Sequence, residues 1–210
     1  MVKDVRLYIE GDTKQNGSGN SITLRQGFNE FFGKWAGEEK IEIKLKPILC
    51  GDRGKAVKIF LNDAALYPED FAALLIDSER EKDVNESAKA FLESDFPNYD
   101  FKNVEESQCH FMVQAMESWF LADKEKLAAC YDNKFHEKAL PQHKEVERIP
   151  KNDAIEKLKK ATKNTRNGKG EYGKGADSGK ILGEINPQKV RTAAPHCERL
   201  FKTIILEIQK

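Results

Sequence analysis

Two groups of carboxylates each follow a short apolar run in this 210-residue sequence. Glu10 ends the run 5–9, and Asp77 and Glu79 follow the run 71–76. In an open parallel α/β sheet the carboxyl ends of the strands lie at one edge, which is where ligands bind. Acids gathered there from separate strands repel each other unless a cation lies between them. The pattern therefore predicts an enzyme that uses a hard divalent cation such as Mg²⁺, which prefers oxygen ligands.

The spacing of these acids also indicates their chemistry. In extended geometry a spacing of two points Asp77 and Glu79 to the same side, where both can bind one ion. Glu10, on a neighbouring strand, can bind a second ion, or orient or deprotonate a nucleophile. Two ions about 4 Å apart stabilise the attacking and leaving oxygens of a phosphodiester. We expect Mg²⁺, with Mn²⁺ as an alternative. The competing interpretation is that the acids are solvated strand ends or helix caps.

The elements that must position these acids follow from the hydrophobic periodicity. It predicts strands over 5–10, 41–49, 71–76 and 109–113, and helices over 21–35, from the turn 51–54 to about 65, and over 83–94, 114–121 and 123–130. This alternating order is typical of an α/β fold with a mostly parallel sheet flanked by helices. Trp119 and the phenylalanines of 28–32 are expected in the core, and so is His110, whose alternative role is a phosphate contact or acid–base catalysis.

The sequence changes character after residue 130. It predicts a Lys-rich helix over 151–163, a flexible basic loop over 164–180 containing five glycines, and helices starting at Pro187 and Pro195. We therefore expect an α/β domain over 1–130 and a helical, basic C-terminal extension over 131–210 packed on it.

The net charge of zero is unevenly distributed. Residues 1–150 carry −7 and residues 151–210 carry +7. A basic extension can hold a polyanion, and internal pairing with the acidic body explains the same charges equally well. The candidate nucleic-acid-binding residues are Lys169, Lys174, Lys180 and Arg191, with Tyr172 available to stack on a base.

Several classes of protein fit the composition poorly. With 33% charged and 39% hydrophobic residues the chain is typical of a soluble protein, and charges interrupt its first apolar stretch, so a cytoplasmic location is expected. The four cysteines form no CxxC pair and are expected to be reduced thiols. Cys130, His136 and His143 match no standard zinc spacing. The glycine-containing loop 17–21 lacks the Gly-Lys-Ser/Thr of a P-loop.

Two motifs resemble a known family. The stretch Leu-Tyr-Ile-Glu-Gly-Asp-Thr at 7–13 resembles the first motif of TOPRIM domains, a strand ending in Glu-Gly. The stretch 74–79 resembles their second motif, a strand followed by Asp-x-Asp, with Glu79 in place of the second aspartate. The resemblance implies a TOPRIM-like fold in which Glu10, Asp77 and Glu79 hold Mg²⁺ and catalyse phosphodiester cleavage.

A narrower resemblance covers residues 110–123 and 194–201, which are similar to the RloG-like, TOPRIM-related family of unknown function. It implies that Glu117 is a fourth acid of the site. Its members are encoded beside ABC/AAA-type ATPases in bacterial defence islands, which implies a nuclease effector of an ATPase-coupled anti-phage defence system, with a nucleic acid and an ATPase as partners.

Two other functions remain open. One is a non-catalytic TOPRIM-like interaction module that docks on a partner ATPase and regulates it. The other is a flavodoxin-like binder of small molecules, which the acidic strand ends disfavour because they repel phosphate. The sequence does not distinguish a DNA from an RNA substrate.

Overall fold

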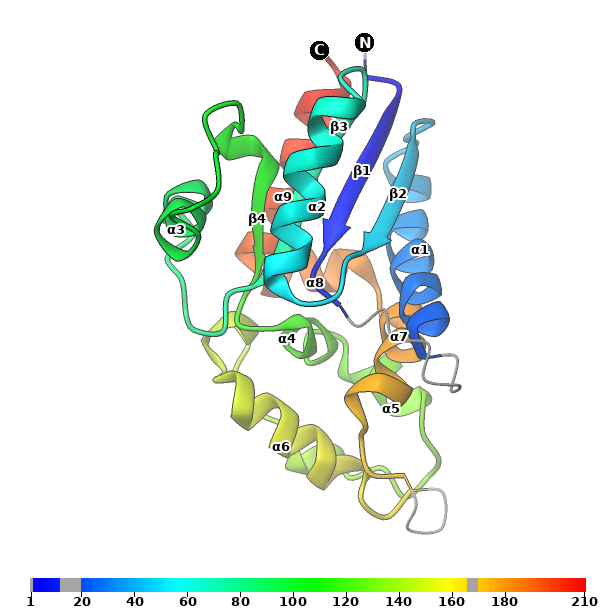
Figure 1. Cartoon of the computed structure of the whole chain (residues 1–210). Helices are drawn as coiled ribbons and strands as arrows, with labels where there is room; N and C mark the ends of the chain where they lie inside the picture. The colour runs from blue at the N-terminus through cyan, green and yellow to red at the C-terminus, as the bar shows by residue number, and fades with distance from the viewer. Residues whose placement is uncertain (1, 12–19, 166–169) are drawn as a thin grey trace.

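Four parallel strands form the sheet at the centre of the computed structural model, which describes residues 2–11, 20–165 and 170–210 (Figure 1). They are β1 (Asp4–Ile9), β2 (Lys44–Leu49), β3 (Phe71–Asp77) and β4 (Cys109–Met112). Their order across the sheet is β2-β1-β3-β4, and each neighbouring pair is parallel. The predicted α/β class with a parallel sheet is therefore confirmed.

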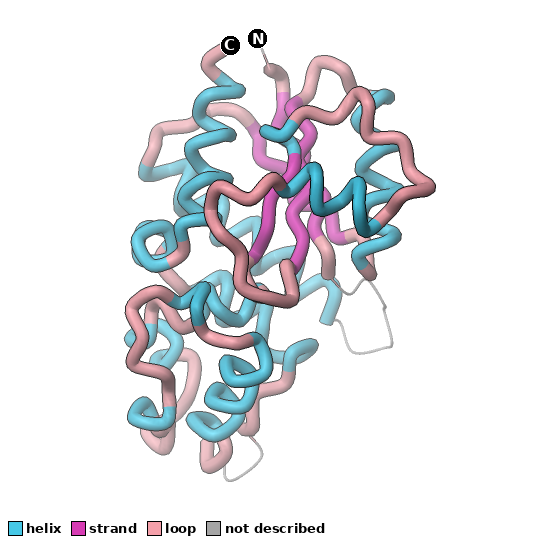
Figure 2. The backbone as a smooth tube through the Cα atoms, turned by 90° about the vertical axis from the view of Figure 1, so that its left-hand side faces the viewer, coloured by secondary structure: helices cyan, strands magenta, loops and turns pink. Residues whose placement is uncertain are grey.

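Helices cover both faces of the sheet (Figure 2). The helices are α1 (Asn20–Glu38), α2 (Arg53–Leu66), α3 (Ala88–Asp95), α4 (Met116–Phe120), α5 (Lys124–Ala129), α6 (Lys151–Thr162), α7 (Lys174–Glu184), α8 (Pro187–Ala193) and α9 (Pro195–Ile208). The described residues also contain short 3-10 helices, η1 (Glu106–Gln108), η2 (Glu137–Ala139) and η3 (Val146–Arg148). The predicted helices that start at Pro187 and Pro195 are present, and each has its proline in the first turn.

Alternation along the strands divides the buried apolar residues into two cores. One core contains Leu7, Leu75 and the predicted aromatic residues of α1, and it extends to Phe201 of α9. The other contains Tyr8 and Leu74 and packs against α2 and α3. All seven residues of β3 are buried, as expected for a central strand covered on both faces.

The C-terminal helices share the first core with the sheet. Trp35 of α1 stacks on Phe201 of α9, with ring centroids 4.1 Å apart, and Trp119 stacks on Phe31 at 5.3 Å. Helix α9 contacts β3 and β4 directly. Residues of the extension thus complete a face of the sheet that the first 130 residues build. The segment from α4 to α7 lies below the carboxyl ends of the strands (Figure 1).

The prediction of a flexible loop over 164–180 is wrong from Lys174 onward, because α7 begins there. Helix α7 crosses α1 closely, because Gly27 of α1 has no side chain. A Cβ atom added at Gly27 of α1 would lie 2.2 Å from the carbonyl oxygen of Gly179 in α7. Ile181, Leu182 and Ile185 of the same segment are buried. Packing against α1 therefore outweighs the low helix propensity of glycine.

Further expectations concern the cysteines, His110 and the membrane. The four cysteines are buried and unbridged. His110 is a core residue: its Nε2 atom lies 2.8 Å from the carbonyl oxygen of Ser107, and burial lowers its pKa to about 4. Among the described residues, no helix has both the length and the apolar character required to cross a membrane.

Candidate active site at the carboxyl edge of the sheet

Glu10 and Asp77 lie side by side at the carboxyl edge of the sheet, as the sequence predicts. They follow and end the neighbouring strands β1 and β3. The backbone N–H of Asp77 donates a hydrogen bond to Glu10 Oε2 at 3.2 Å. The backbone N–H of Glu10 in turn donates to the carbonyl oxygen of Leu75 at 3.0 Å. The strand pairing therefore fixes the separation of the two acids.

The turn after β2 brings a cation to the same place. Gly51 has φ 88°, a conformation that glycine adopts without strain, and it exchanges two backbone hydrogen bonds with Gly11. Helix α2 then begins at Arg53. Its Nε atom lies 3.5 Å from Glu10 Oε2, and its Nη2 atom donates to the carbonyl oxygen of Asp77 at 2.8 Å. Arg53 thus ties the ends of β1 and β3 together.

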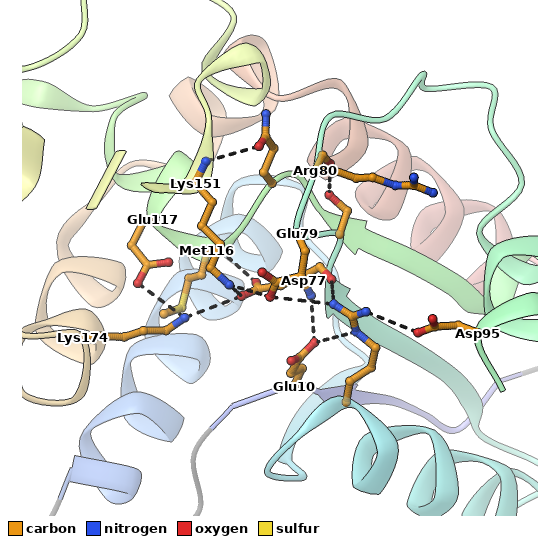
Figure 3. A network of polar contacts seen from close by, with 12 residues as sticks. Glu10, Asp77, Glu79, Arg80, Asp95, Met116, Glu117, Lys151 and Lys174 are labelled. Atoms are coloured by element: carbon orange, nitrogen blue, oxygen red, sulfur yellow. Dashed lines mark hydrogen bonds and ion pairs between the residues drawn. The ribbon is translucent and has the colours of Figure 1, made fainter. Parts of the chain in front are cut away.

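Asp77 and Glu79 do not form the extended pair that their spacing predicts. Glu79 has φ 62°, in the left-handed region that a glutamate rarely adopts, so the extended geometry ends before it. Its carboxylate accepts a hydrogen bond from Lys151 Nζ at 2.5 Å. Asp77 Oδ2 lies 3.5 Å from the same Nζ atom. The two acids therefore meet at the ammonium group of Lys151, the first residue of α6 (Figure 3).

Glu117 comes to the site from helix α4 and not from a strand. It lies in the first turn of α4 and is fully buried. Its Oε1 atom accepts a hydrogen bond from the hydroxyl of Tyr172 at 2.9 Å. Lys174 Nζ lies 3.7 Å from Glu117 Oε1 and 3.6 Å from Asp77 Oδ2, and so bridges the two acids (Figure 3). Glu117 Oε2 is buried with no hydrogen-bond partner. The acid that the narrower resemblance implied is therefore next to Asp77.

Burial shapes the electrostatics of this cluster. It raises the pKa of Asp77 from 3.8 to about 7, against the opposing effect of Lys174 and Lys151. Burial also raises the pKa of Glu10, although Arg53 opposes it. For Lys151 burial lowers the pKa, but the hydrogen bond to Glu79 and the charge of Asp77 outweigh it, so its pKa is raised. The site therefore holds Lys151 firmly protonated beside two acids, Asp77 and Glu10, that bind protons more strongly than usual.

The cations predicted to bind nucleic acid lie in different places. Lys169 lies outside the described residues. Lys174 lies in the acid site, and Lys180 Nζ donates to the carbonyl oxygen of Cys130 at 3.1 Å. The interpretation of Tyr172 as a stacking platform is wrong, because its ring is buried and its hydroxyl is bonded to Glu117 and Ser178.

Arg191 is engaged within the protein. Its guanidinium pairs with Glu39 and Glu198, and it lies 5.6 Å from the centre of the Phe201 ring. Its side chain is 12% exposed. The role of these cations in binding nucleic acid stays a prediction, and Lys174, Lys180 and Arg191 each contact different groups within the described chain.

The described residues contain no ready-made cluster of metal-binding side chains. Across 2–11, 20–165 and 170–210, no group of three or more His, Cys, Asp and Glu side chains is arranged to hold a metal ion. At the carboxyl edge, three cations lie among the acids instead: Arg53, Lys151 and Lys174.

Sequence reasoning missed two of these cations. Arg53 is visible as part of the turn 51–54 after a predicted strand, so its position at the sheet edge was a usable signal. Lys151 has no such signal, because it is one of several lysines in a predicted helix and 72 residues separate it from Glu79. Only the packing of α6 below the sheet brings it to the acids.

The fold and the site define an α/β protein with a partly buried acid–lysine cluster at the carboxyl edge of its sheet. Residues 10–205 match the family described as a domain of unknown function, DUF4276. Since the match covers most of the chain, the protein belongs to that family. No curated protein and no solved structure matches it.

Proposed function

We propose that this protein is a Mg²⁺-dependent nuclease that cleaves phosphodiester bonds, with Mn²⁺ as an alternative cofactor. The observation that supports the proposal is the mixed cluster at the carboxyl edge. Glu10, Asp77 and Glu117 provide buried or half-buried oxygens, and Lys151 and Lys174 provide positive charge beside them. Cleavage of a phosphodiester needs both, because acids hold the metal and cations stabilise the phosphate.

The residues present fit a hard divalent cation. Glu117 Oε2 is a buried carboxyl oxygen without a hydrogen-bond partner, which is an unusual and costly arrangement for a polar group. Asp77 Oδ2 has ammonium neighbours at 3.5 and 3.6 Å, both longer than a good hydrogen bond. Asp77 and Glu117 are therefore the residues that would hold the ion. A bound Mg²⁺ would supply Lewis-acid stabilisation of the charge that develops on the phosphodiester oxygens.

The other residues have separate roles in the proposed reaction. Glu10 is suited to accept a proton from an attacking water, because burial raises its pKa and makes its carboxylate a stronger base. Arg53 holds Glu10 in place and fixes the end of β3 through the carbonyl oxygen of Asp77. Lys151, held by Glu79, keeps a positive charge where a phosphate would approach.

The cellular role is proposed from the TOPRIM and RloG-like resemblances. They support an effector of an ATPase-coupled anti-phage defence system that acts on DNA or RNA in the cytoplasm beside a partner ATPase.

The test is single-turnover cleavage of labelled DNA and RNA with Mg²⁺ or Mn²⁺. Asp77→Asn and Glu10→Gln should reduce cleavage at least a hundredfold, since each removes a group needed in the reaction. Glu93→Gln is the matched control, because Glu93 is an exposed acid of α3 that pairs with Lys89 of the same helix. Undiminished cleavage by the two site variants would eliminate the proposed roles.

One observation favours the second candidate, a non-catalytic module that regulates a partner ATPase. Arg53, Lys151 and Lys174 lie beside the acids and offset part of their negative charge without a metal ion. A Mg²⁺ titration separates the two functions. A nuclease should gain thermal stability in millimolar Mg²⁺, following the linkage of ligand binding to folding. A regulatory module should show no change, and its wild-type and Asp77→Asn forms should bind the ATPase equally.

A further inference from the structure

Lys174 lies between two acids that come from different parts of the fold. Asp77 ends the central strand β3, and Glu117 lies in α4. The Nζ atom of Lys174 is nearly equidistant from Asp77 Oδ2 and Glu117 Oε1, at 3.6 and 3.7 Å. Neither distance is that of a good hydrogen bond, so the ammonium neutralises the pair without satisfying either carboxylate.

We propose that Lys174 is an internal counter-ion, which occupies the cation position between Asp77 and Glu117 until a divalent metal ion displaces it. This inference rests on the proposed function and adds the regulation of its metal site. The sequence assigned the metal to Glu10, Asp77 and Glu79, whereas this inference assigns it to Asp77 and Glu117, with Lys174 as the competitor.

The unpartnered oxygen of Glu117 is an independent sign that the ammonium is a poor occupant. Glu117 is fully buried, and its Oε2 atom has no hydrogen-bond partner. Tyr172 and Lys174 both act on the other oxygen, Oε1. A small divalent ion accepts several oxygen ligands at about 2.1 Å and carries twice the charge. It can therefore satisfy the carboxylates more completely than one ammonium group held at a longer distance.

The exposure of the two lysines decides which of them leaves. The Lys174 side chain is 52% exposed, and its residue is the first of α7, directly after Gly173. It can turn into solvent with little disturbance of the helix. Lys151 is 19% exposed and is held by a 2.5 Å hydrogen bond to Glu79. The metal should therefore exchange with Lys174 and leave Lys151 in place.

The experiment is the calorimetric measurement of Mg²⁺ affinity on the full chain. Lys174→Met removes the competing charge and should tighten Mg²⁺ binding at least about tenfold, because a charge about 4 Å away has a strong effect in a partly buried site. Lys174→Gln repeats the removal with a polar side chain. Lys174→Arg retains the charge and should bind Mg²⁺ within about twofold of wild type.

Two control variants complete the design. Lys160→Met makes the same substitution at an exposed lysine of α6 that pairs with Glu156, so the affinity should not change. Glu117→Gln in the Lys174→Met background should lose the gain, because the proposed metal ligand is then removed.

The outcomes separate this inference from the proposed function. Equal Mg²⁺ affinity in wild type and both charge-removing variants would overturn the counter-ion role and leave the metal-dependent function standing. A gain that survives Glu117→Gln would overturn the assignment of Glu117. Failure of wild type and of both Lys174 variants to bind Mg²⁺ or Mn²⁺ would overturn the inference together with the metal-dependent function.

Discussion

Asp77→Asn should change the pH dependence of stability in a way that can be calculated from the site. Burial raises the pKa of Asp77 from 3.8 to about 7 in the folded protein. Between these values the folded state holds a proton that the unfolded state has lost, so the free energy of unfolding falls as the pH rises. The difference of about three pH units, at about 1.4 kcal/mol each, corresponds to about 4 kcal/mol.

The substitution should remove this penalty and keep the geometry. An asparagine at position 77 can still accept the hydrogen bond that Met116 N–H donates to Asp77 Oδ1 at 3.1 Å. The free energy of unfolding of the variant, minus that of wild type, should therefore rise by up to about 4 kcal/mol between pH 4 and pH 8. This prediction concerns the change in the difference, and it does not depend on which protein is more stable at pH 4. The gain should be largest above pH 7, where Asp77 of the folded wild type is ionised.

The assay is urea unfolding of both proteins at half-unit steps of pH from 4 to 8.5 in the presence of a chelator. The difference between the two proteins is needed, because burial also lowers the pKa of His110 from 6.5 to about 4. That group makes stability rise with pH over much of the range where Asp77 makes it fall, so the two contributions oppose each other in the wild-type profile. Glu93→Gln, an exposed acid of α3, should differ from wild type by a constant amount. A constant difference for Asp77→Asn as well would refute the reasoning.

Three further predictions concern packing, the buried network and the released lysine. Gly27→Ala should destabilise the protein by more than about 2 kcal/mol in urea unfolding, because the added Cβ would meet the Gly179 carbonyl oxygen. Gly33→Ala is the control, and it should be neutral or stabilising because a Cβ at Gly33 has no neighbouring atom within 4 Å. Tyr172→Phe should cost about 1–3 kcal/mol by leaving Glu117 and Ser178 without their shared partner, and Tyr99→Phe, at a partly exposed ring, should change stability by less than about 0.5 kcal/mol. In saturating Mg²⁺, Lys174→Met should weaken binding of a phosphorothioate oligonucleotide and lower its salt dependence by about one unit, unlike Lys160→Met; equal salt slopes would show that the released ammonium does not reach phosphate.

The parts of the fold that the sequence predicted depend on local pattern. The continuous apolar run of β3 and the placement of Glu10 and Asp77 after strands both follow from residues adjacent in the chain. The geometry of Glu79 does not, because its left-handed backbone depends on the hydrogen bond that its N–H donates to the carbonyl oxygen of Gln114 at 2.9 Å. A spacing of two predicts a shared side only while the chain stays extended.

The start of α7 and the cations of the site depend on tertiary contacts. The glycine-rich stretch before residue 180 has a composition typical of a loop. Its helical structure is explained by a tertiary contact, the close approach of the Gly179 backbone in α7 to Gly27 in α1. Lys151 and Lys174 are ordinary members of a basic segment in the sequence. Their role is visible only when the segment folds back below the sheet.

The same folding explains much of the opposite charge of the two parts of the chain. Cations of the extension pair with acids of the body: Arg191 with Glu39, Lys189 with Asp123, Arg199 with Glu106, and Lys151 with Asp77 and Glu79. A polyanion gains little from a cation that must first leave an acid partner, because the lost ion pair offsets the new one. The exception is an ion pair whose cation has already been displaced from the acid by a metal ion. Lys174 meets that condition in the proposed site, so the binding of the metal ion and the binding of phosphate by Lys174 should depend on each other there.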